Sequence, residues 1–132
     1  LRRQLSWIDQ QLEAVADGAP VFVFLNVGET HVPYWHEDAD WPREPSPCVP
    51  FDGPNNSRRR SRRQQQACLE WIDHELGSLL HRFADETVIL CADHGDCWGE
   101  DGLWEHGISH WATLTVPLLM RVRGEPVKAR AR

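Results

Sequence analysis

Thr87-Val-Ile-Leu-Cys-Ala92, followed at once by Asp93-His94-Gly95, is the stretch that decides how this chain is interpreted. The apolar run is rich in β-branched residues, which predicts a strand buried on both faces of a helix-covered sheet. Asp93 and His94 then stand just past its carboxyl end, where ligands bind in open α/β sheets. Gly95 allows a turn that aims both side chains at one divalent ion. The alternative is a purely structural role, in which Asp93 caps a helix and His94 fills a gap in the packing.

A second apolar run, Val21-Phe-Val-Phe-Leu-Asn-Val27, ends in a similar way with Glu29-Thr30-His31-Val32-Pro33-Tyr34. If the two strands run parallel, their carboxyl ends meet at one sheet edge, and His31 lies beside the Asp-His pair. A loop histidine with a backbone partner is the alternative for His31.

Two more histidines, His106 and His110, follow the Asp-His pair after a glycine-rich turn. Gly99, Gly102 and Gly107 let this segment fold back toward the strand end. We expect Asp93, His94, His31 and His106 to converge on one pocket, with His110 as an alternative to His106. An aspartate and a histidine suit zinc or manganese, whereas an all-oxygen set suits calcium or magnesium better.

The rest of the chain predicts an α/β fold with a partial, mostly parallel sheet flanked by helices. Apolar residues at helical spacing predict helices over residues 4–16 and from about residue 57 to residue 83. Residues 28–56 hold six prolines without periodicity and predict a long loop, while residues 116–121 predict a third strand.

Length and charge restrict the function classes. The 132 residues correspond to one domain, and the net charge of −6 argues against a nucleic-acid binder. The arginine cluster at positions 58–63 is interpreted as a solvated helix start, with phosphate or nucleic-acid binding as the alternative.

No apolar run approaches the roughly 20 residues of a membrane helix. Four cysteines without a C-x-x-C pair favour the cytoplasm, with Cys91 expected to be buried in its strand.

Three blocks of the sequence resemble the sulfatase-like hydrolases of the alkaline phosphatase superfamily. Residues 24–34 resemble the segment in which a strand ends in an acidic residue and His-x-Pro. Residues 68–80, with Asp73 and Gly77, resemble the helix that follows. Residues 88–120 resemble the block Ser-Asp-His-Gly-Glu, Leu-Gly-x-x-Gly-Leu-Trp and Val-Pro-Leu. Blocks in this order are far more specific than any one motif.

The resemblance implies an alkaline-phosphatase-like α/β fold and a metal-dependent hydrolase or transferase acting on small sulfate or phosphate esters. It implies that Asp93 and His94 bind the divalent metal. It also implies that His31 and His106 contact the transferring group. A histidine at position 106, where the family also uses lysine, is similar to phosphoryl-transferring members.

The departures from the family pattern concern the nucleophile. No stretch of the sequence resembles the nucleophile block or supplies the further acidic metal ligands, and no cysteine stands in a Cys-x-Pro-x-Arg context. We therefore expect residues 1–132 to be one domain that is the C-terminal part of a larger catalytic domain, with the missing N-terminal half as its partner. The alternative is a non-catalytic α/β module that retains only the fold.

Overall fold

The computed structural model describes residues 1–43 and 58–128. The first helix, α1, spans Arg2–Glu13 and buries Ile8, with Leu5 packed against the core. It was expected over residues 4–16. Its earlier start is held by Arg2, which bonds to Glu75 and Asp38, so interactions with distant residues place this helix end.

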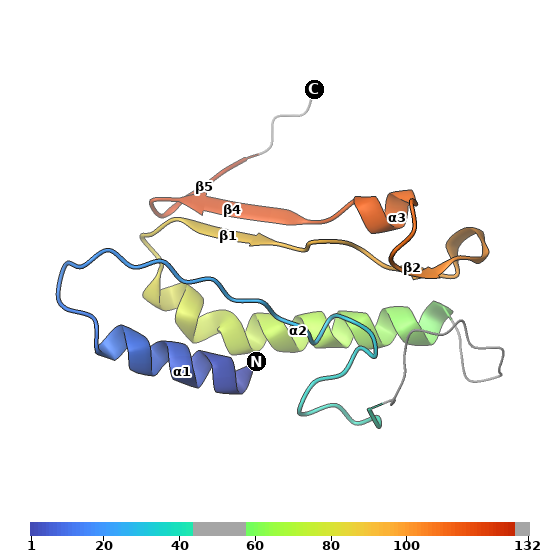
Figure 1. The fold of residues 1–132 in the computed structure, drawn as a ribbon, viewed down its shortest axis with the longest axis horizontal. Coiled ribbons are helices and arrows are strands. Elements are labelled where there is room, and N and C mark those ends of the chain that lie inside the picture. Colours follow the sequence, from blue (N-terminus) through green and yellow to red (C-terminus); the bar gives the residue numbers. More distant parts are fainter. Residues whose placement is uncertain (44–57, 129–132) are drawn as a thin grey trace.

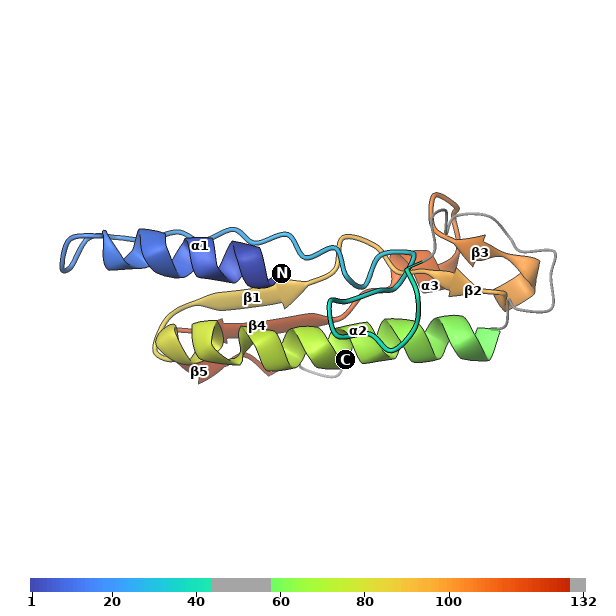
Figure 2. The ribbon, with the colours of Figure 1, turned by 90° about the horizontal axis from the view of Figure 1, so that it is seen from below.

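The second helix, α2, spans Arg58–Arg82 and is the longest element of the described chain. It buries Cys68, Trp71, Ile72 and Leu76, whereas Leu69 on the same helix is exposed. Leu25, Val27 and Leu90 pack against the main cluster of buried residues, which consists of Leu1 and three residues of α2. Both helices lie on one side of the sheet (Figures 1 and 2).

The sheet is antiparallel where the described residues pair. β1 (Val88–Cys91) pairs with β4 (Leu118–Val122), and β4 pairs with β5 (Glu125–Pro126). The expected mixture of helices and strands is present, but the expected parallel pairing is not seen among these strands. Parallel neighbours need a long crossover connection, usually a helix, and the segment between β1 and β4 contains no long helix.

Residues 21–27 are extended but belong to no strand within the described residues, contrary to expectation. Figures 1 and 2 show this segment running beside β1, on the side away from β4. Leu25 and Val27 reach the core, whereas Phe22 is 88% exposed and Phe24 is 80% exposed. Because no described strand covers it, the run is buried on one face only.

The segment between β1 and β4 forms a small lobe at one end of the molecule. β2 (Cys97–Trp98) and β3 (Trp104–Glu105) make a hairpin around the short 3-10 helix Glu100–Gly102, and α3 (Trp111–Leu114) follows. The hairpin packs beside the N-terminal end of α2 (Figure 2). Gly99 has a φ of 98°, a conformation that favours glycine and lets the turn close.

Two expectations about the surface can be compared with the structure. Cys91 is exposed rather than buried, because the outer face of the sheet is not covered by any described element. Among the described residues, no helix has the length and apolar character needed to cross a membrane.

Candidate active site

The loop after β1 is held by a close backbone approach at Gly95. The Gly95 N–H donates to the carbonyl oxygen of Thr113 at 2.9 Å, and a Cβ at Gly95 would stand only 2.1 Å from the carbonyl oxygen of Ala112. Only glycine therefore fits here without a shift of α3. The turn held by this contact leaves the His94 side chain 31% exposed and the Asp93 side chain 92% exposed.

The loop that carries His31 is anchored from both sides. The His31 N–H donates to the Gly28 carbonyl, and the Tyr34 N–H donates to the His31 carbonyl at 2.8 Å. Val32 and Tyr34 are buried against Cys68 of α2, in a second core cluster. These contacts place His31 at the end of the extended segment, as the sequence suggested, although no sheet edge is formed there.

Three histidines from separate segments meet at this point. The ring centroids of His94 and His106 are 4.0 Å apart and stacked, and His31 lies 4.8 Å from His106 and 6.0 Å from His94. One ligand nitrogen from each ring lies within 4.8 Å of the others. An Asp93 carboxylate oxygen is 3.9 Å from His94 Nε2. The arrangement thus brings His31, His94 and His106 together, with Asp93 beside them.

The hydrogen bonds of these rings indicate which nitrogen is available. His31 Nδ1 is 2.7 Å from the Val32 carbonyl oxygen, and His94 Nδ1 is 3.1 Å from the Gly95 carbonyl oxygen. A carbonyl oxygen only accepts, so both Nδ1 atoms carry the proton and donate it. His106 Nδ1 is 2.8 Å from a carboxylate oxygen of Asp96. In all three rings Nε2 is left for a ligand.

The residue types fit a divalent metal. Imidazole nitrogen and carboxylate oxygen are both ligands that zinc accepts, and because zinc commonly takes four ligands, Asp93 and His94 would leave positions for further ligands and for the oxygens of an ester. Histidine ligands of metals usually donate their other ring N–H to a carboxylate or a backbone carbonyl, as these three do. A calcium or magnesium ion is a poorer fit, because both prefer oxygen ligands.

A buried carboxylate that sequence reasoning did not single out lies behind the histidines. Asp96 is 8% exposed; its second carboxylate oxygen accepts from the Tyr34 hydroxyl at 2.9 Å and from the Gln65 side-chain amide at 3.1 Å. Burial, with the charge of Asp96 as the next cause, raises the Tyr34 pKa above its usual range, so the hydroxyl stays a donor. The signals in the sequence were its place two residues after His94 and its match to the acidic residue that ends the Ser-Asp-His-Gly-Glu block.

His110, the alternative to His106, is turned to other partners. Its Nε2 is 3.1 Å from an Asp101 carboxylate oxygen, and its Nδ1 is 3.1 Å from the Cys97 sulfur. Nδ1 also accepts from the Ala112 N–H, which caps α3. The Cys97 thiol is buried, and desolvation raises its pKa. These contacts indicate a structural role for His110.

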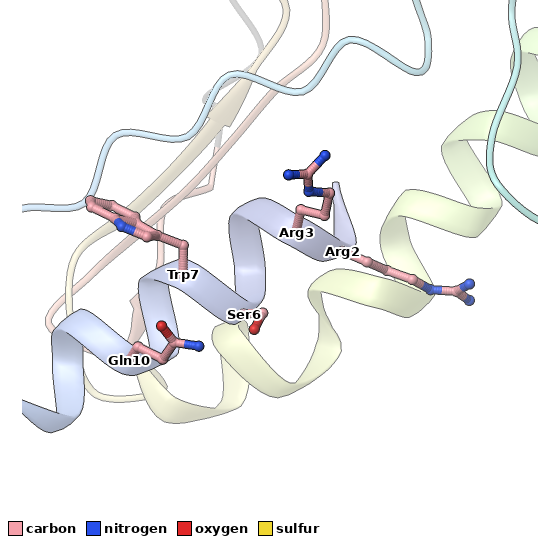
Figure 3. Close-up of a pocket in the computed structure, with 5 residues that line it drawn as sticks. All are labelled: Arg2, Arg3, Ser6, Trp7 and Gln10. Carbon is pink, nitrogen blue, oxygen red and sulfur yellow. The ribbon is translucent and has the colours of Figure 1, made fainter.

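A surface depression occurs elsewhere, along α1 (Figure 3). No histidine of the cluster and no other predicted site residue lines it, so it is separate from the candidate active site. Its lining side chains are Arg2, Arg3, Ser6, Trp7 and Gln10.

Comparison with known proteins identifies the family of this chain. The sulfatase family model matches residues 5–132. The chain belongs to the sulfatase family. This confirms the resemblance expected from the motifs. The chain is similar to a choline-sulfatase from Rhizobium meliloti (strain 1021), with 38% identity over 76 residues, which is 53% of this chain. The matched segment spans 15% of that relative's length. No solved structure matches this chain.

Proposed function

We propose that the protein containing this chain is a metal-dependent sulfuric ester hydrolase. The observation that carries the proposal is the convergence of His31, His94 and His106 beside Asp93 in a chain of the sulfatase family. The similarity to a choline-sulfatase favours a small sulfate ester as substrate. Phosphate esters remain the second candidate, because His106 is a feature that sulfatase-like phosphoryl-transferring enzymes share.

In this proposal Asp93 and His94 hold the metal, which would neutralise charge on the ester oxygens. His31 and His106, from two other segments, flank that position and contact the oxygens of the transferring group. When protonated, each donates from Nε2 to an anionic oxygen, a charge-assisted bond stronger than a neutral one. His110 would take no part, because its ring nitrogens are engaged by Asp101, Cys97 and the backbone.

We propose that the nucleophile lies outside these 132 residues. Cys97 is near the site in sequence, but its burial and raised pKa argue against a reactive thiolate. We propose that the N-terminal half of the catalytic domain supplies the nucleophile and further acidic ligands. Strands from that half would also complete a mostly parallel sheet, covering the exposed aromatic side chains of residues 21–27. The cytoplasmic location expected from the cysteines stays a prediction.

The test uses the full-length protein, stripped of metal with a chelator and reloaded with zinc, manganese, calcium or magnesium in turn. Turnover of 4-nitrophenyl sulfate, 4-nitrophenyl phosphate and choline sulfate is measured for each. We expect sulfate ester turnover that needs the metal and is lost in Asp93→Ala. The isolated 132-residue chain should be inactive, since it lacks the nucleophile. A full-length protein that binds metal but cleaves none of the esters would support the non-catalytic alternative.

A further inference from the structure

The buried carboxylate of Asp96 joins three segments of the chain. One oxygen faces His106 Nδ1, just after β3, and the other accepts from Tyr34 and from Gln65 of α2. Its side chain is only 2% exposed. A buried carboxylate is costly unless each of its oxygens is hydrogen-bonded, and here both are. Asp96 is therefore locked in place independently of His106.

The fixed position of Asp96 determines the orientation of the His106 ring. With Nδ1–H directed at Asp96, the opposite nitrogen, Nε2, is the one left for substrate or metal. The ring then stacks on His94 and stands edge-on to His31. Among the three clustered histidines, His106 alone has a carboxylate as its Nδ1 partner, since His31 and His94 use backbone carbonyls. A side-chain partner can be removed by substitution, so its role can be tested.

We propose that Asp96 is a positioning residue: held by Tyr34 and Gln65, it sets the tautomer and orientation of His106 so that Nε2 faces the reaction centre. This inference rests on the proposed function only in assigning His106 a part in ester hydrolysis. The competing explanation is that Asp96 merely ties together the loop of Tyr34, α2 and the β2–β3 hairpin. In that case its removal would loosen the lobe whether or not His106 is present.

The decisive experiment is a double-mutant cycle in the full-length protein, with kcat and KM for 4-nitrophenyl sulfate as readouts. Asp96→Asn keeps the shape of the side chain. We expect it to lower kcat about 10- to 100-fold, the range known for removing the outer partner of a metal-bound histidine. In a His106→Ala background the same substitution should have no further effect. An equal loss in both backgrounds, or no loss in either, would overturn the proposal.

Two further variants sharpen the result. Tyr34→Phe removes one of the two bonds to the second oxygen of Asp96 and should lower kcat only a few-fold. Asp101→Asn, the matched control, removes the carboxylate beside His110 and should leave kcat unchanged. Thermal unfolding of each variant checks that the lobe stays folded. If Asp96→Ala does not fold, the near-isosteric Asn variant still decides the question.

A readout independent of activity separates this proposal from the proposed function. Nitrogen-15 spectra of histidine-labelled full-length protein report which ring nitrogen of His106 carries the proton, with its signals assigned by their loss in His106→Ala. We expect Nδ1–H in the native protein and a changed tautomer balance in Asp96→Asn. An inactive protein with this tautomer would sink the proposed function alone. An unchanged tautomer in the variant would sink the role of Asp96.

Discussion

Two histidine–carboxylate pairs lie within the same small lobe, and they are built in opposite ways. In the first, the carboxylate of Asp96 is buried, while the His106 ring is partly open to the other histidines. In the second, the carboxylate of Asp101 is 80% exposed, while the His110 side chain is 8% exposed and covers a thiol. The same two residue types therefore give a partly accessible imidazole ring in one pair and a buried imidazole ring in the other.

The buried partner of each pair therefore determines what the pair can do. A buried carboxylate holds its ring firmly and leaves the far nitrogen pointing at open space. A buried ring has both nitrogens used up by its surroundings, and it stabilises the local fold. We therefore expect substitutions around the first pair to change chemistry and those around the second to change stability alone.

The largest effect is expected at the metal position beside the first pair. His94→Ala in the full-length protein should lower kcat for 4-nitrophenyl sulfate about 10³-fold, near the upper end for losing one group that stabilises a transition state. Bound metal, measured by elemental analysis, should fall as well. The exposed His74 on α2 is the matched control, and His74→Ala should behave like the native protein. Native activity and metal content in His94→Ala would remove it from the site.

The two pairs are compared directly by His106→Ala and His110→Ala. The first should lower kcat about 100-fold, within the range for losing one positioned hydrogen-bond donor, and should also lower the free energy of unfolding by about 1–3 kcal/mol, because one oxygen of buried Asp96 loses its partner. The second should leave kcat within about twofold but cost about 1 kcal/mol of stability, because the α3 cap is lost. Denaturant unfolding and steady-state kinetics give the two numbers. The reverse pattern in kcat would exchange their roles.

Gly95 lies between the two pairs, since it directly precedes Asp96 in the chain and its N–H bonds to Thr113 of α3, the helix that His110 caps. Gly95→Ala places a methyl group against the Ala112 carbonyl and should destabilise the protein by about 1–3 kcal/mol. Gly77→Ala is the control, because a Cβ there meets nothing within 4 Å in the interior of α2. It should stabilise by about 0.5–1 kcal/mol. Equal changes in the denaturation midpoints of both variants would argue against the close approach.

The smallest effect concerns the thiol of the second pair. The pKa of Cys97 is raised by burial, and that of Cys68 is raised to about 12 by the same cause. At pH 8 iodoacetamide should therefore modify exposed Cys91 at least about tenfold faster than Cys97 or Cys68, because the thiolate is the reactive form. Peptide mass spectrometry measures each site separately. Fast labelling of Cys97 would reopen it as a nucleophile.

Local patterns in the sequence were sufficient for the elements nearest the site. The apolar run before Asp93 forms β1, and the helical spacing after residue 57 forms α2. The strand-end positions of His31 and Asp93 and the glycine-rich turn before His106 predicted that these residues meet, and the ordered motifs led to the family. Such features are local because side-chain periodicity and turn chemistry depend on neighbouring residues.

Other features of the fold and the site depend on long-range contacts. Antiparallel pairing of β1 with β4, the exposure of Phe22 and the placement of each carboxylate depend on segments far apart in the chain. Asp96 and Asp101 look alike in sequence, each near a glycine and a histidine. One is buried because Tyr34, Gln65 and His106 surround it, and the other is not. Burial is a property of segments brought together by folding, so no local pattern could distinguish the carboxylate behind the site from the one on the surface.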